Sequence, residues 1–251
     1  MIETTDHGPV RLLRMNHPPA NAIGPELVAA LRTALAAAPA AGARGLVLSG
    51  RPGMFSGGLD VPRLLQVQRD DLLRLWQGFY SLLHELAASP LPVVAAISGH
   101  SPAGGAVLSI FCDYRVMAAG RFKIGLNEVR VGLALPPLVY RALVHLLGQR
   151  RGELLAVTGQ LIEPEAALQL GLVDEVVAPE AVEERAITWC QELLALPPEA
   201  VALTRRRARQ ALVDLCQQAQ SEPEALLDDW YSPETQATLN AVAAQLTQKK
   251  G

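Results

Sequence analysis

Lysine, cysteine and aromatic residues are all scarce in this chain. Only three of its 22 basic residues are lysine, and the formal net charge is −3. Because there is no basic surplus, we do not expect a nucleic acid or an anionic membrane surface as a partner. Aromatic residues make up 4% of the sequence, so the core is expected to consist mainly of leucine, valine and alanine.

The cysteines also exclude some classes of protein. Cys112, Cys190 and Cys216 are far apart and form no C-x-x-C motif. This pattern favours a reducing compartment over a disulfide scaffold or a zinc site. No apolar run approaches the roughly 20 residues that cross a bilayer, and the polar N-terminus resembles neither a signal peptide nor a transit peptide. We therefore expect a cytoplasmic protein with no membrane span and no metal.

Strands alternate with helices in the first 180 residues. Compact apolar runs predict strands at 10–15, 45–48, 92–97, 114–117 and 172–177. Helical spacing of apolar residues predicts helices at 24–38, 70–88 and 106–111. This order is typical of β-α-β units with a mainly parallel sheet. Glycine-containing segments at 51–60 and 98–105 are predicted to be loops.

The remainder of the chain is predicted to be helical, with breaks at Pro197, Pro223 and Pro233. The sequence thus predicts an α/β core at residues 1–180 and a helical C-terminal region at 181–251. The tail helices are expected to pack on the core or on a neighbouring subunit.

Two glycine-containing loops follow predicted strands, at 54–60 and 98–105. Glycine pairs in loops usually only make turns. No G-x-G-x-x-G or G-x-x-x-x-G-K-[ST] motif is present, so a nucleotide site is not supported. Loops at the carboxyl ends of adjacent parallel strands can instead direct free backbone N–H groups at one oxygen, as an oxyanion hole requires.

The order and separation of several motifs resemble the enoyl-CoA hydratase/isomerase, or crotonase, family. These motifs are F-S-G-G-L-D (55–60), G-H-S-P-A-G-G-A-V-L (99–108), C-D-Y-R (112–115) and I-G-L-N-E (124–128). The resemblance runs from about Leu12 to Val177. It implies a ClpP-like ββα spiral core with a C-terminal helical region, assembled as a homotrimer or a hexamer. The implied substrate is an acyl-CoA thioester, and no separate cofactor is implied.

The resemblance also assigns the site. It implies that the backbone N–H groups of Leu59 and Gly104 hold the thioester oxygen and that Glu128 transfers a proton. Other positions that it implies for the substrate site are Ala20, Ala22, Ile23, Gly57, Gly58, Asp60, Val61, His100, Pro102, Val107 and Gly132. Asp60 has an alternative role as a helix cap, and His100 has one as a packed, hydrogen-bonded side chain.

Val107 decides between the reactions of this family. Hydratases of the family carry a glutamate three residues after the oxyanion glycine, and here that residue is Val107. With Glu128 alone, moving a double bond from C3–C4 to C2–C3 is easier than adding water, because one base can remove and return the proton. The motifs are also most similar to those of mitochondrial-type Δ3,Δ2-enoyl-CoA isomerases. We therefore predict an isomerase.

The neighbours of Glu128 support a role as a base. A lone glutamate in a loop is ordinarily a solvated surface charge. Here the nearby apolar residues are expected to desolvate the carboxylate and raise its pKa toward neutrality. They are Leu126, Val129, Val131 and Leu133.

Three other functions stay open at this point. A hydratase could take its second acid from elsewhere in the chain. A catalytically silent protein could bind or assemble around acyl-CoA. A serine hydrolase could use Ser56 or Ser101, although neither lies in a G-x-S-x-G motif. The basic run at 205–209 is expected to form a solvated helix face, with contact to the phosphates of coenzyme A as the alternative.

Overall fold

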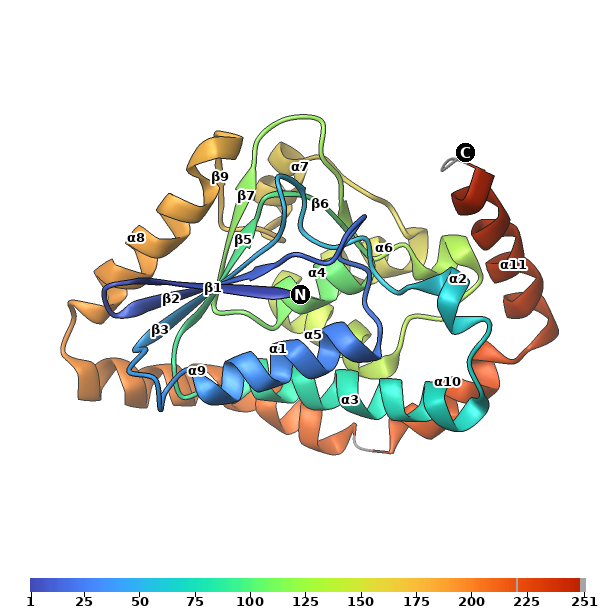
Figure 1. The fold of residues 1–251 in the computed structure, drawn as a ribbon, viewed down its shortest axis with the longest axis horizontal. Coiled ribbons are helices and arrows are strands. Elements are labelled where there is room, and N and C mark those ends of the chain that lie inside the picture. The colour runs from blue at the N-terminus through green and yellow to red at the C-terminus, as the bar shows by residue number, and fades with distance from the viewer. Residues whose placement is uncertain (220, 249–251) are drawn as a thin grey trace.

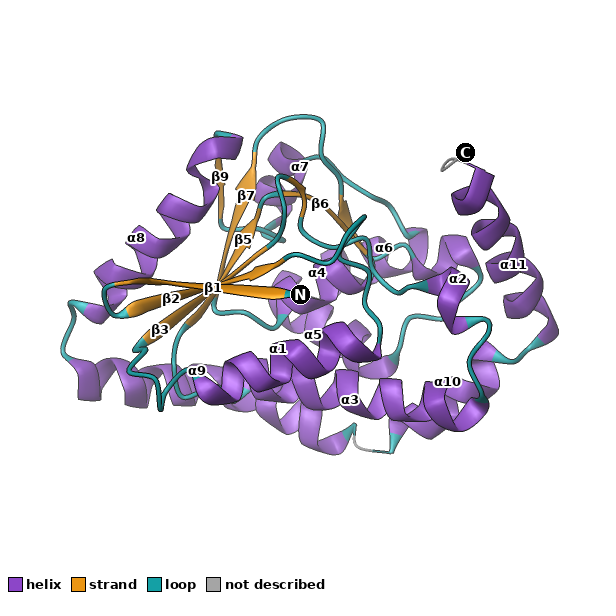
Figure 2. Cartoon of the chain, in the orientation of Figure 1, coloured by secondary structure: helices purple, strands orange, loops and turns teal. Residues whose placement is uncertain are grey.

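The computed structural model describes residues 1–219 and 221–248 and contains two sheets with helices packed around them (Figures 1 and 2). The strands are β1 (Ile2–His7), β2 (Val10–Met15), β3 (Gly45–Ser49), β4 (Gly53–Met54), β5 (Val93–Ile97), β6 (Gly99–Pro102), β7 (Tyr114–Ala118), β8 (Ile124–Gly125) and β9 (Glu175–Val177). The helices are α1 (Pro25–Ala37), α2 (Val61–Leu64), α3 (Arg69–Ala87), α4 (Gly104–Ile110), α5 (Pro137–Leu147), α6 (Gln149–Thr158), α7 (Pro164–Leu170), α8 (Val182–Leu194), α9 (Pro198–Gln218), α10 (Glu222–Trp230) and α11 (Pro233–Gln248).

The larger sheet has six strands in the order β1-β2-β3-β5-β7-β9, and both of its faces are covered. Successive side chains of a strand point to opposite faces. In β3, Leu46 and Leu48 therefore join the main core, with α1 and α3, while Val47 joins a second core beneath α8. Burial on both faces explains why β3 and β5 are continuous apolar runs rather than alternating ones.

The smaller sheet has the order β4-β6-β8 and gives the fold its spiral form. Each of β3, β5 and β7 lies in the larger sheet, and the strand that follows it lies in the smaller one. The chain therefore repeats a ββα turn, which confirms the fold class predicted from the sequence. A Cβ atom at Gly99 would overlap the backbone of Gly53, so β4 and β6 can lie this close only because residue 99 is glycine.

Several predicted loops and boundaries were wrong. The segments 51–60 and 98–105 contain β4 and β6, which are too short to show a period of two residues. Strand β1 was not predicted because its residues are polar and mostly exposed, as an edge strand allows. The strand predicted at 172–177 is limited to Glu175–Val177.

Helix α9 is held to the core by two arginines of the basic run. The Arg205 guanidinium pairs with both carboxylate oxygens of Asp113, each at 2.8 Å. The Arg209 guanidinium pairs with Asp113 at 3.3 Å and donates to the carbonyl oxygens of Ala87 and Phe111. The predicted solvated face was therefore wrong for these two arginines, because they neutralise a largely buried carboxylate.

The helical C-terminal region was predicted to extend to residue 251. Residues 220 and 249–251 lie outside the described part of the chain. No helix of the described residues has both the length and the apolar character that crossing a membrane requires.

Candidate active site

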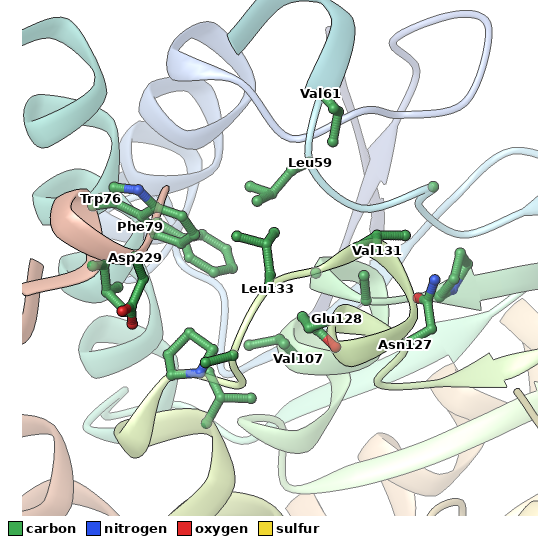
Figure 3. A pocket seen from close by; sticks show the side chains of 18 of the residues that line it. Leu59, Val61, Trp76, Phe79, Val107, Asn127, Glu128, Val131, Leu133 and Asp229 are labelled. Carbon is green, nitrogen blue, oxygen red and sulfur yellow. The ribbon is translucent and has the colours of Figure 1, made fainter. Parts of the chain in front are cut away.

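A cavity of about 240 Å³ lies where the glycine-containing loops meet α3 and the tail helices. At one end are Asn127 and Glu128, and at the other end are Trp76, Phe79 and Asp229 (Figure 3). The lining between the two ends is mainly apolar. Such a cavity can hold an apolar chain with a polar reactive group at one end.

The two predicted oxyanion loops lie side by side in the cavity wall. Leu59 and Gly104 both line the cavity, and a Cβ atom at Gly58 would lie 3.3 Å from the Gly104 nitrogen. Neither the Leu59 N–H nor the Gly104 N–H donates a hydrogen bond to another described residue. Two neighbouring loops of the cavity wall thus each keep one backbone N–H group that no described residue accepts from.

The backbone conformation of Ala103 positions the second donor. Ala103 has φ 47° and ψ −123°, a conformation that is unfavourable for a residue with a side chain. Its own N–H donates to the Gly125 carbonyl oxygen at 2.8 Å, which ties this turn to β8. Strain of this kind persists where the surrounding structure fixes it, often in binding loops.

The serines of these loops have structural positions. Ser56 is fully buried, donates to the Asn21 carbonyl oxygen at 2.8 Å and accepts from the Gly58 N–H at 3.2 Å. Ser101 is also fully buried. Neither serine lines the cavity, so nothing in this geometry favours a serine nucleophile.

Glu128 begins a short 3₁₀ turn that ends at Val131. Its Oε2 atom is buried and has no hydrogen-bond partner in the described residues. Burial raises the pKa of Glu128 to about 7. Of the four apolar residues expected to desolvate this carboxylate, Leu126 is buried and Val131 and Leu133 line the cavity, whereas Val129 is 41% exposed.

Val107 lies in the same wall, next to Glu128 in Figure 3. Among the described lining residues, the other carboxylate belongs to Asp229, at the far end of the cavity. The reactive end therefore contains one carboxylate and the apolar side chain of Val107. The described residues also contain no group of three or more histidine, cysteine, aspartate or glutamate residues that could hold a metal ion.

The other residues predicted for the site fall into two groups. Those that line the cavity are Gly57, Val61 and Pro102. Those that do not are Ala20, Ala22, Ile23, Gly58, Asp60, His100 and Gly132.

Backbone hydrogen bonds of the second group hold the loop that carries Leu59, and they involve Ala20, Ile23 and Gly58. The Gly57 N–H donates to the Ala20 carbonyl oxygen at 2.8 Å, and the Ile23 N–H donates to the Gly58 carbonyl oxygen at 2.7 Å. Asp60 precedes α2, but its side chain makes no capping hydrogen bond.

His100 and Gly132 have other neighbours. The His100 ring packs edge-on against Phe122, and its Nδ1 accepts from the Lys123 N–H at 3.1 Å. The Gly132 carbonyl oxygen accepts from Thr235 of α11 at 2.7 Å. His100 is therefore packed, and Gly132 holds α11 in place.

The sequence motifs did not point to the far wall of the cavity. Trp76, Phe79 and Tyr80 of α3 line it, together with Leu226 and Asp229 of α10. On an amphipathic helix, buried aromatic residues look like ordinary core residues. One signal was available, because three aromatic residues occur within five positions of α3 in a chain that is only 4% aromatic.

Asn127 was also missed, although it precedes Glu128 in the N-E motif. Its side chain lines the cavity, and its buried Oδ1 atom has no partner in the described residues. The reactive end thus holds two neighbouring oxygen atoms, Asn127 Oδ1 and Glu128 Oε2, that have no partner among the described residues.

Comparison with known proteins gives a consistent result. A profile of the enoyl-CoA hydratase/isomerase family matches residues 5–240. The mitochondrial enoyl-CoA delta isomerase 1 of Mus musculus is 31% identical over all of this chain and 88% of its own length. A putative enoyl-CoA hydratase of Thermus thermophilus is 32% identical over 80% of each chain. The crystal structure of human mitochondrial Δ3-Δ2-enoyl-CoA isomerase superposes with a TM-score of 0.94 at 30% identity, covering all of this chain and 99% of that one. The chain belongs to the enoyl-CoA hydratase/isomerase family.

Proposed function

We propose that this protein isomerises 3-enoyl-CoA thioesters to 2-enoyl-CoA thioesters with Glu128 as its base. The observation that carries the proposal is the single carboxylate at the reactive end of the cavity, beside Val107. An isomerase can return the abstracted proton to the substrate and so needs one base. The relatives named as enoyl-CoA delta isomerases, at about 31% identity over the whole chain, support the same reaction.

In this mechanism the thioester oxygen accepts hydrogen bonds from the Leu59 and Gly104 N–H groups. Glu128 removes a proton from C2, and the electron pair moves through the carbonyl group to form a dienolate. The two N–H groups stabilise the negative charge on its oxygen. Glu128 then gives the same proton to C4, which leaves the double bond between C2 and C3. A base with a pKa of about 7 is well matched to both transfers.

Replacing Glu128 tests the proposal. We expect E128Q to lower kcat for a 3-enoyl-CoA by about 10²- to 10⁴-fold, the usual contribution of a general base. The rise in absorbance of the conjugated product measures the rate. E165Q is the matched control, because Glu165 is an exposed glutamate at the start of α7 that does not line the cavity. Turnover by E128Q close to that of E165Q would remove Glu128 from the mechanism.

A hydratase is the second candidate, and the relative named as a putative hydratase supports it. The purified protein should be incubated separately with 3-enoyl-CoA and with 2-enoyl-CoA. We expect conversion of the first substrate and little hydration of the second, because Val107 cannot supply a second acid. Hydration as the faster reaction would favour the hydratase. Binding of the thioester with turnover of neither substrate would favour a silent acyl-CoA-binding protein.

We also propose a homotrimer or a hexamer, a cytoplasmic location, and catalysis without a separate cofactor. The family membership supports the assembly. The proton transfer needs no group beyond Glu128, the two N–H donors and the thioester itself.

A further inference from the structure

We propose that Asp229 and the aromatic wall of α3 limit the substrate to an acyl chain of about eight carbons. This inference rests on the proposed function, because it assigns the position of the acyl chain relative to Glu128. It makes Asp229 a specificity-determining residue.

The cavity has a definite direction. Glu128 lies at one end, Phe79 and Trp76 lie at the other, and the side chains of Leu59 and Leu133 lie between them (Figure 3). A thioester oxygen held by the Leu59 and Gly104 N–H groups places C2 near Glu128. The rest of the acyl chain then extends toward α3 and α10.

The volume sets the length of chain that fits. A dry cavity of about 150 Å³ holds a benzene ring, which has six non-hydrogen atoms. By the same ratio, the cavity of about 240 Å³ holds roughly ten such atoms. Two of them are the thioester oxygen and sulfur, which leaves room for about eight carbons.

Hydrogen bonds hold the far wall in place. The Tyr80 hydroxyl donates to Glu222 Oε2 at 3.1 Å, and the Leu138 N–H donates to the same oxygen at 2.9 Å. Arg141 pairs with the other oxygen of Glu222. Glu222 therefore joins the start of α10 to α3 and α5, and the wall cannot move back easily to admit a longer chain.

Asp229 makes a longer chain unfavourable at an exposed part of this wall. It lines the cavity but is itself exposed, and its carboxylate makes no ion pair or side-chain hydrogen bond with the described residues. An apolar chain that passed the wall would have to displace water from this carboxylate, which is costly. Carbons beyond the wall therefore weaken binding.

Kinetics with 3-hexenoyl-, 3-octenoyl- and 3-dodecenoyl-CoA test the inference. Each buried methylene should raise kcat/KM about fourfold. We therefore expect a rise of roughly 16-fold from hexenoyl to octenoyl, and a lower value for dodecenoyl than for octenoyl. Replacing Asp229 with leucine, which extends the apolar lining, should raise the dodecenoyl-to-octenoyl ratio at least about tenfold. F79A, which removes the wall itself, should raise it as well.

E224L is the control, because Glu224 is an exposed residue of α10 that does not line the cavity. We expect its ratio to equal that of the unaltered protein. Circular dichroism and the melting temperature establish that each variant folds. An unaltered protein that converts dodecenoyl-CoA as well as octenoyl-CoA would overturn the inference, as would D229L with an unchanged ratio.

Binding separates this inference from the proposed function. Calorimetric titration with saturated octanoyl- and dodecanoyl-CoA involves no proton transfer. Tighter binding of octanoyl-CoA, reversed in D229L, would support the chain-length limit even if the protein isomerised no 3-enoyl-CoA. Equal affinities would overturn the limit while leaving the isomerase proposal intact.

Discussion

At the residue scale, the Glu128 carboxyl group is placed where a charge is costly. Its Oε2 atom is buried without a partner in the described residues, and this burial raises its pKa to about 7. An ionised carboxylate in such surroundings loses much of its hydration. This burial reduces the stability of the fold, but it also lets the Glu128 carboxyl group both accept and release a proton near neutral pH.

The pKa of Glu128 predicts how activity depends on pH. The base must be ionised to remove the C2 proton, so kcat for a 3-enoyl-CoA should rise with pH and reach half of its maximum near pH 7. Below that pH the rate should fall about tenfold per unit. A pH–rate profile from pH 5 to 9 measures this. A profile that is flat down to pH 5 would show that Glu128 titrates at its ordinary value.

The same pKa shift predicts a change in stability. Between the ordinary pKa of 4.5 and about 7, the folded chain retains a proton that the unfolded chain has lost. The free energy of unfolding therefore falls as pH rises through this window, by about 3 kcal/mol in total. E128Q removes the ionisable group and with it this pH-dependent loss of stability. The melting temperature of E128Q should therefore exceed that of the unaltered protein by several degrees at pH 8, with little difference at pH 4.5. A difference that did not depend on pH would contradict this account.

Replacing Val107 with glutamate tests whether a second carboxylate at the reactive end adds hydratase activity. V107E would place a second carboxylate beside Glu128, as in the hydratases of the family. We expect hydration of 2-enoyl-CoA to appear above the level of the unaltered protein, and like-charge repulsion to raise the apparent pKa of the pair. V107L, an apolar replacement, is the control and should gain no hydration. If V107E folds, binds 2-enoyl-CoA and adds no water, the identity of residue 107 does not decide the reaction.

At the scale of elements, one largely buried carboxylate joins α9 to the core. Arg205 and Arg209 both pair with Asp113, and the Val93 N–H donates to the same side chain at 2.7 Å. Asp113 therefore connects α9 with the start of β5. This contact explains why two arginines of a basic run point inward, which their spacing alone does not indicate.

Removing the charge of Asp113 should be strongly destabilising. D113N leaves two largely buried arginines without their carboxylate, so we expect a loss of about 3–5 kcal/mol in the free energy of unfolding, measured by urea denaturation. D71N is the control, because Asp71 pairs with Arg74 on the exposed surface of α3 and should cost less than about 1 kcal/mol. Equal effects of the two substitutions would contradict the anchoring role.

The sequence predicted the long elements well and the short ones poorly. Helix α3 and strand β3 lie within one residue of their predicted bounds, because each has a strong apolar pattern. Strands β4 and β8 have two residues each, so neighbouring backbone defines them rather than any pattern. The motifs pointed to Glu128, Leu59 and Gly104, and all three residues line the same cavity. The far wall forms only when α3 and α10 meet, and the aromatic cluster of α3 was its one signal in the sequence.

At the scale of the whole molecule, α6 exposes an apolar face. Leu154 is 52% exposed and Val157 is 75% exposed, and their spacing of three residues puts them on the same side of the helix. Single exposed apolar residues are common, but a shared face on one helix is suited to contact between subunits.

The assembly can be tested on this face. We expect the unaltered protein to have the mass of a homotrimer or a hexamer by analytical ultracentrifugation. The double variant L154E/V157E should shift this mass toward the monomer, because it would bury like charges at the contact. L203E, which alters an exposed leucine of α9, is the control. A double variant with unchanged mass would place the interface elsewhere.

The close approach of β4 and β6 at Gly53 and Gly99 also affects how this protein can diversify. The two strands set the spacing between the loops that carry the Leu59 and Gly104 donors. Val107 and Asp229, for which we propose roles in selecting the reaction and the chain length, lie on helices outside that contact. Mutations can therefore accumulate in the specificity residues while the spacing of the donors stays fixed. This separation allows new substrates and new reactions to evolve on an unchanged catalytic frame.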